Sequence, residues 1–126
     1  MKKQIEIRQA TLEDLTEVTS IFRNTILHVC SKDYSEKHIK VWASGADDIE
    51  KWKERIHKFY FIVAEIENVV VGFAYLTKGN YFDGLFIHKD YQRLGIASKL
   101  MRIIESQVIM NGFEIITNGF FDSFFT

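Results

Sequence analysis

The amino-acid pattern predicts a domain of the mixed α/β (α+β) class, built on one mixed β-sheet with helices on both faces. Three apolar strand-like segments follow one another in the middle of the chain and predict an antiparallel meander. Helical patterns precede this meander, and a strand, helix and strand close the chain as a parallel βαβ crossover. Because 126 residues suit one hydrophobic core, we expect residues 1–126 to form a single domain.

The N-terminal half predicts one strand and three helices. Ile5 and Ile7 alternate with polar neighbours, which is typical of a strand. Thr11 is followed three positions later by a carboxylate, so we expect a helix to start there. Further helix starts are predicted at Ser35 and at residues 46–48.

The C-terminal half predicts the meander and the crossover. Short polar turns at residues 67–68 and 78–80 separate the apolar runs. Asn111 and Gly112 are typical of a helix end. The expected elements are strands at 60–64, 69–76 and 81–88, a helix at 96–108, and a parallel strand at 113–117.

Composition and charge exclude several classes of function. The formal net charge is -1, so no global basic field recruits nucleic acid. No stretch is apolar for long enough to predict a membrane span, and the N-terminus lacks the apolar region of a secretory signal. The four histidines lack the paired spacing of a metal site. A single cysteine suits a reducing compartment, and we expect a cytoplasmic protein that binds neither membrane nor nucleic acid.

The stretch YQRLGIASKL, residues 91–100, joins the last strand of the meander to the following helix. Backbone N–H groups at a helix N-terminus are unpaired and lie at the positive end of the helix dipole, where phosphate oxygens bind. Gly95 allows close approach to the backbone, and small Ala97 and Ser98 leave the first turn uncrowded. On the loop alone, a solvated turn whose glycine starts the helix is the alternative.

The segment LFIHKDYQRLGIASKLMRIIE resembles the acetyl-CoA-binding motif of the GCN5-related N-acetyltransferase (GNAT) superfamily. That motif reads Gln/Arg-x-x-Gly-x-Gly/Ala after an apolar strand, and Gln92, Gly95 and Ala97 fill its defining positions. The segments CSKDYSEKHIKVWAS, EKWKERI and VAEIENVVVGFAYL and the aromatic ending are similar to a bacterial branch of this superfamily, of unassigned acceptor.

The resemblance implies acetyl-CoA as co-substrate and a GNAT-like fold. It implies that the strand at 81–88 offers backbone groups to the pantetheine arm, that the following loop holds the pyrophosphate, and that the two parallel strands splay around the thioester. The residues so implied are Leu85, Phe86, Ile87, Gln92, Arg93, Leu94, Gly95, Ile96, Ala97 and Ser98.

Three residues are candidates for the catalytic machinery. Asp83 is the leading candidate for the general base, and by period-two alternation we expect it to share a face with Tyr81 and Leu85. A solvated carboxylate is the alternative. His28 and Tyr34 fall where the superfamily builds its acceptor wall, as a second base and an acid or acceptor contact. A surface histidine and a packed tyrosine are their alternatives.

Members of the superfamily usually continue past the fifth strand into a helix and two more strands, whereas this sequence stops at Thr126. We therefore expect a fold that lacks the last two strands. An uncovered edge strand favours self-association, so we expect a homodimer.

The resemblance implies direct acetyl transfer from acetyl-CoA to a primary amine of a small molecule or protein. The alternative is a catalytically impaired CoA-binding or interaction module with the same fold. A nucleotide-binding domain is a third possibility, but the lone glycine, the missing Walker lysine and the antiparallel meander argue against it.

Overall fold

The computed structural model describes residues 4–28, 35–78, 80–113 and 116–117. Their element order agrees with the order that the sequence predicts. Along the chain the elements are β1 (Ile5–Gln9), η1 (Leu12–Asp14), α1 (Leu15–His28), α2 (Glu36–Ala43), η3 (Ser44–Asp47), α3 (Ile49–Lys58), β2 (Tyr60–Ile66), β3 (Val69–Thr77), β4 (Tyr81–Ile87), η4 (Lys89–Tyr91), α4 (Ile96–Met110) and β5 (Ile116–Thr117).

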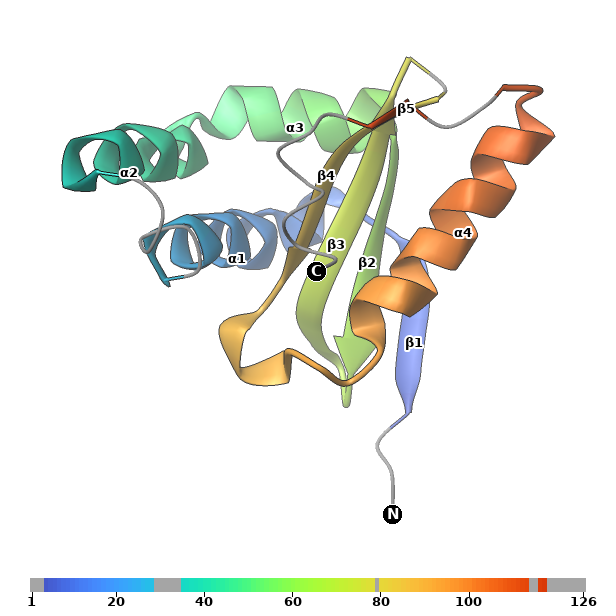
Figure 1. Ribbon diagram of the computed structural model, residues 1–126, viewed down its shortest axis with the longest axis horizontal. Coiled ribbons are helices and arrows are strands. Elements are labelled where there is room, and N and C mark those ends of the chain that lie inside the picture. The colour runs from blue at the N-terminus through green and yellow to red at the C-terminus, as the bar shows by residue number, and fades with distance from the viewer. Residues whose placement is uncertain (1–3, 29–34, 79, 114–115, 118–126) are drawn as a thin grey trace.

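One mixed sheet forms the centre of the molecule, with the strand order β1-β2-β3-β4-β5 (Figure 1). Neighbouring strands from β1 to β4 are antiparallel, and β5 pairs with β4 in parallel after the α4 crossover. The predicted meander and the predicted parallel crossover are therefore both confirmed. Of the predicted strand at 113–117, residues 116–117 form β5, Phe113 is exposed and lies outside it, and residues 114–115 lie outside the described residues.

Helices cover both faces of the sheet, as predicted. Figure 1 shows α1, α2 and α3 on one face and α4 on the other. Each face has its own apolar cluster because successive residues of a strand point to opposite sides. The α1–α3 face buries Val18, Ile21, Ile39, Trp52, Phe61, Phe73 and Phe86, among others. The α4 face buries Ile62, Leu76, Phe82, Leu85, Ile96, Leu100 and Ile104, among others.

Polar side chains start the helices at the positions that the sequence predicts. The Ser35 hydroxyl accepts a hydrogen bond from the backbone N–H of His38 at 3.3 Å. The Asp48 carboxylate likewise accepts from the N–H of Lys51 at 3.3 Å. Such caps satisfy N–H groups that have no partner within the helix, which fixes the first residue of α2 and of α3.

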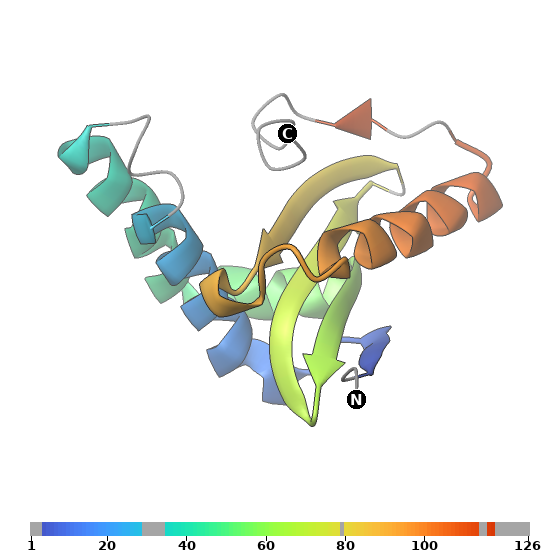
Figure 2. The same ribbon diagram turned by 60° about the horizontal axis from the view of Figure 1, so that its bottom comes forward.

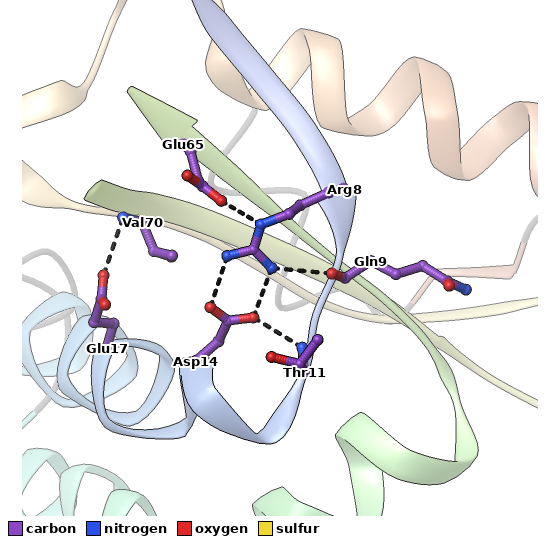
Figure 3. A network of polar contacts seen from close by, with 7 residues as sticks. All are labelled: Arg8, Gln9, Thr11, Asp14, Glu17, Glu65 and Val70. Carbon is purple, nitrogen blue, oxygen red and sulfur yellow. Dashed lines mark hydrogen bonds and ion pairs between the residues drawn. The ribbon is translucent and has the colours of Figure 1, made fainter. Parts of the chain in front are cut away.

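An arginine and an aspartate connect the start of α1 to the edge of the sheet (Figure 3). Two nitrogens of the Arg8 guanidinium each lie 2.8 Å from an oxygen of the buried Asp14 carboxylate, and Arg8 also donates to Glu65 on β2. The same carboxylate accepts from the N–H of Thr11 at 2.8 Å. Hydrogen bonds from Arg8 hold the pKa of Asp14 below its usual value. The pair fixes the direction in which α1 leaves the sheet.

A second contact joins α1 to β3. The carboxylate of Glu17 accepts a hydrogen bond from the backbone N–H of Val70 at 3.0 Å (Figure 3). Val70 lies where the pairing of β2 with β3 shifts by one residue, next to Glu65. A bulge disrupts the strand ladder, so a side chain from the helix supplies the acceptor there.

Candidate functional site

Strand β4 contains a β-bulge at the leading candidate base. Tyr75 on β3 pairs with Gly84, but the next residue of β3, Leu76, pairs with Phe82. Asp83 is therefore an extra residue of β4 without an opposite residue on β3. A bulge of this kind changes which face the following side chains occupy.

The bulge overturns the prediction that Tyr81, Asp83 and Leu85 share one face of β4. Leu85 packs in the apolar cluster under α4, whereas Asp83 lines a pocket on the α1–α3 face together with Phe86. Unbroken alternation was the wrong assumption, because it does not hold across an extra residue. Asp83 and Phe86, three positions apart, are the two residues of β4 in this pocket.

The pocket on the α1–α3 face has a volume of about 310 Å³. Its wall is largely aromatic, and its polar residues carry charges of both signs. The lining residues are Phe22, Ile26, Trp42, Gly45, Asp48, Lys51, Trp52, Arg55, Tyr75, Asp83 and Phe86. The pocket lies between the helices and the sheet. One wall comes from α1, α2, α3 and the segment between α2 and α3, and the other wall comes from β3 and β4.

Tyr75 lies across β4 because Gly84 has no side chain. A Cβ atom at Gly84 would come within 2.0 Å of Cε1 of the Tyr75 ring. Burial raises the pKa of Tyr75 above its usual value, the negative charge of Asp83 adds to this effect, and the positive charge of Arg55 opposes it. The tyrosine hydroxyl therefore stays protonated at neutral pH.

Arg55 is held against the aromatic wall of the pocket. Its guanidinium lies 4.6 Å from the centre of the Trp52 ring and 5.6 Å from that of Tyr75, distances at which a cation is attracted to an aromatic face. Trp52 itself is 1% exposed and donates its indole N–H to the carbonyl of Gly45 at 3.0 Å. The arginine is thus fixed by a rigid neighbour.

The three predicted catalytic residues lie in different places relative to the pocket. Asp83 is half-buried and lines the pocket. His28 is the exposed last residue of α1 and is not among the described residues of the pocket wall. Tyr34 lies outside the described residues. The structure therefore brings one of the three to the pocket.

The loop from β4 to α4 has the conformation of an anion-binding turn. Arg93 and Gly95 have positive φ angles of 63° and 82°, with Leu94 between them. Alternation of this kind makes successive backbone N–H groups converge. The first hydrogen bond of α4 runs from the N–H of Lys99 to the carbonyl of Gly95 at 3.1 Å. The N–H groups of residues 96–98 therefore have no partner within the helix.

Space and charge around this loop suit an anion. A Cβ atom at Gly95 would meet no atom within 4 Å, so there is space for a side chain. A glycine is favoured there because the φ angle is positive. The first turn of α4 contains no acidic residue, and Arg93 and Ser98 are exposed. Anions are stabilised at such a helix end by the dipole and the free N–H groups.

The loop joins the end of β4 to the start of α4 (Figure 2), and hydrogen bonds hold it against the sheet. The amide of Gln92 donates to the carbonyl of Ile87 at 2.9 Å. The backbone N–H of His88 donates to the carbonyl of Val71 at 2.8 Å, and the His88 ring accepts from the N–H of Asp90 at 3.0 Å. The side chain of Gln92 thus closes the loop on the strand, a role that the sequence pattern does not reveal.

Among the described residues, one side of β4 is paired with another strand along only a short part of its length. In the described part of the chain, β5 pairs with β4 only at Tyr81 and Phe82. Since His88 donates toward β3, alternation directs the backbone groups of Leu85 and Ile87 to the opposite side, where Ile87 accepts from Gln92. The open edge of β4 thus runs directly into the anion-binding loop.

The described residues contain neither a metal-binding cluster nor a helix that could cross a membrane. No group of three or more His, Cys, Asp or Glu side chains is placed there to hold a metal ion. None of the described helices has the length and apolar character that a membrane crossing requires.

The sheet order, the crossover helix and the loop define the N-acetyltransferase class of fold, and comparisons with known proteins agree. The family model described as acetyltransferase (GNAT) domain matches residues 30–118. The model covers most of the chain, so the protein belongs to the GNAT family of acetyltransferase domains.

Individual relatives support the same assignment. An uncharacterized N-acetyltransferase of Escherichia coli, YafP, is 34% identical over 104 residues, which are 82% of this chain and 67% of that protein. A crystal structure of a GCN5-related N-acetyltransferase from Rhodopseudomonas palustris aligns with a TM-score of 0.87 and 28% identity, over 99% of this chain and 81% of the other. PaiA N-acetyltransferase from Thermoplasma acidophilum, solved with coenzyme A, aligns with a TM-score of 0.79 and 23% identity, over 87% and 75% of the chains.

Sequence reasoning missed Arg55 and Tyr75 as residues of the pocket. Arg55 belongs to a helix rich in charges, where a cation normally faces solvent, and Tyr75 reads as an ordinary strand residue. One signal was present: a lone glycine within a strand pattern, Gly84, is typical of a bulge or of a close approach.

Proposed function

We propose that this protein is an acetyl-CoA-dependent N-acetyltransferase that transfers the acetyl group directly to a primary amine. The observation that carries the proposal is that β4 connects two sites. Its open edge leads into the anion-binding loop, and its bulge directs Asp83 into the pocket. A cofactor along the edge and an acceptor in the pocket then meet at one strand.

The loop is suited to the pyrophosphate of the co-substrate. Backbone N–H groups of residues 93–98 surround a site at the positive end of α4. Leu85 and Ile87 offer the strand-like backbone groups with which the pantetheine arm can pair. PaiA N-acetyltransferase, whose fold is similar, was solved with coenzyme A.

The pocket residues have defined parts in the transfer. Asp83 accepts a proton from the acceptor ammonium, directly or through a water molecule, so that the neutral amine attacks the acetyl carbonyl. The N–H of Leu85 donates to that carbonyl oxygen, and this hydrogen bond strengthens as negative charge develops there. The acetyl group then forms an amide with the amine, and the thiolate of coenzyme A leaves and takes up a proton.

The test is an assay of thiol release from acetyl-CoA with a panel of primary amines, supported by mass spectrometry of the acetylated product. Acceptor-dependent thiol release with formation of the N-acetyl product is the expected result. Binding of acetyl-CoA without turnover of any amine would contradict transfer and favour the alternative of a CoA-binding module. Failure to bind acetyl-CoA at all would exclude both.

A further inference from the structure

The pocket on the α1–α3 face contains a cation and an anion that do not pair with each other. Arg55 projects into it from α3 and Asp83 from the bulge of β4. Neither residue forms an ion pair with any residue in the described part of the chain. Arg55 and Asp83 are both half-buried, and opposite charges in such a site attract strongly. Because they nevertheless do not pair, the surrounding structure must hold them apart.

The scaffold keeps these two groups apart through rigid neighbours. Arg55 stacks on Trp52, which is almost fully buried and anchored to Gly45. Asp83 is fixed by the bulge, beside a ring of Tyr75 that fills the space above Gly84. Both charges influence the pKa of Tyr75 in opposite directions, so both lie near its side chain.

The tyrosine hydroxyl adds a neutral polar group near the two charges. Tyr75 is 4% exposed, and no hydrogen bond joins its hydroxyl to any other described residue. A hydroxyl without a protein partner is satisfied by water or by a ligand. The pocket thus presents a cation, an anion and a hydroxyl that can donate and accept.

The rest of the pocket wall is aromatic and favours a ligand with an apolar side chain. Rings of Phe22, Trp42, Trp52 and Phe86 enclose the pocket, with Phe22 5.0 Å from Trp52 and 5.3 Å from Phe86 between ring centres. At the outer part of the lining, exposed Lys51 and Asp48 carry one charge of each sign. The pocket as a whole therefore has no net preference for a cation or an anion.

We infer that the acceptor is a free amino acid with an apolar, aromatic side chain, bound as a zwitterion. Arg55 binds its carboxylate, Asp83 receives its ammonium group, and the aromatic wall surrounds its side chain. Arg55 is then the residue that determines specificity for a carboxylate beside the amine. The inference rests on the proposed function, because it assigns the acceptor of the same site.

The test uses three probes that differ by one group: phenylalanine, 2-phenylethylamine, which lacks the carboxylate, and 3-phenylpropionate, which lacks the amine. Both tryptophans of the chain line the pocket, so intrinsic fluorescence reports occupancy without any need for turnover. Phenylalanine should bind at least about tenfold more tightly than either analogue, the usual effect of a hydrogen bond to a charged group. Its KM in the transfer assay should be lower than that of 2-phenylethylamine by a similar factor.

Variants of α3 identify the responsible cation. Arg55→Met should remove the preference for phenylalanine over 2-phenylethylamine, and Arg55→Lys should retain part of it. Lys53→Met is the matched control, because Lys53 is a cation of the same helix outside this pocket, paired with Glu50 at 3.5 Å. The control should keep the full preference.

The outcomes separate this inference from the proposed function. Tight binding of phenylalanine that depends on Arg55, without acetylation of any amine, supports the inference and contradicts the proposed transfer. Acetylation of 2-phenylethylamine with equal or better binding than phenylalanine supports the transfer and overturns the inference. Absence of both binding and acetylation at millimolar probe concentrations overturns both.

Discussion

Three local features of Asp83 support the proposal that it takes the proton. It is the extra residue of the β4 bulge, it lines the pocket and it is half-buried, so that water reaches it while the aromatic wall surrounds it. No described residue forms an ion pair or hydrogen bond with its carboxylate. Its oxygens are therefore available to an acceptor amine.

Replacing Asp83 with asparagine keeps the shape of the side chain and removes its capacity to take a proton. We expect kcat/KM for the amine to fall by about 10²–10⁴, the usual range for the loss of a general base. Affinity for coenzyme A should not change. Steady-state kinetics with acetyl-CoA, together with calorimetric titration of coenzyme A, provide the measurement.

The matched control for this substitution is Asp47→Asn. Asp47 is an exposed carboxylate that pairs with Arg23 on the surface, so its loss should leave the transfer rate unchanged. Equal activity of the Asp83→Asn variant and the native protein would show that water or another group takes the proton.

At the scale of elements, the start of α4 and the loop before it form the turn that we propose to bind the pyrophosphate. Gly95 at the beginning of this helix and Gly112 just beyond its end have similar positive φ angles, 82° and 80°. An added Cβ meets no atom within 4 Å at either position. The two glycines are therefore matched in backbone strain and differ in their position relative to the loop.

Gly95→Ala should lower the free energy of unfolding by about 1–2 kcal/mol, because a side chain in the left-handed region is strained. It should also weaken binding of coenzyme A, since its Cβ projects where the pyrophosphate approaches the backbone. Gly112→Ala should cost similar stability and leave the affinity unchanged. Chemical denaturation and calorimetry separate the effects, and equal affinities in the two variants would contradict the assignment of the loop.

The Arg8–Asp14 pair gives the α1 junction a dependence on pH. The folded state holds the pKa of Asp14 below its usual value of 3.8, so the unfolded chain binds a proton that the folded chain does not. The pair therefore contributes its full stability above the usual pKa, and this contribution is lost as the pH falls through and below that value.

Asp14→Asn should lower the free energy of unfolding at neutral pH by about 1–3 kcal/mol, because Arg8 loses a bidentate partner. Below the usual pKa of an aspartate the difference from the native protein should shrink. Urea denaturation at a series of pH values measures both effects. A difference that stays constant with pH would show that geometry and not charge stabilises this junction.

At the scale of the whole molecule, the sheet separates two functions that share β4. The loop to α4, which we propose for the cofactor, lies at the end of β4 (Figures 1 and 2). The α1–α3 face contains the pocket that we propose for the acceptor. Loss of Arg55 alters the pocket without touching the loop. Cofactor binding and acceptor binding are thus open to separate measurement in one chain.

Coenzyme A should raise the midpoint of thermal unfolding of the native protein. A ligand that binds only the folded state at 100 times its Kd adds about 2.7 kcal/mol. The Arg55→Met variant should show a similar rise because its loop is intact. Scanning fluorimetry or calorimetry measures the shift, and no rise at millimolar coenzyme A would contradict the assignment of the loop.

Local patterns were sufficient to predict the element order, the helix caps at Ser35 and Asp48, and the two-sided covering of the sheet. These features depend on residues close in sequence and on alternation. The composition of the pocket could not be predicted in the same way. Tyr75 crosses β4 only because its partner on that strand is Gly84, and Arg55 faces inward only because Trp52 lies beneath it.

The bulge interrupts the alternation of side chains between the two faces of β4 at Asp83. Before it, Phe82 belongs to the α4 face, and after it Leu85 does so again although three positions separate them. Loss of one residue between Phe82 and Gly84 would restore unbroken alternation with the faces unchanged, and it would remove the carboxylate from the pocket. Relatives that keep this pocket should therefore vary here by substitution and not by change of length.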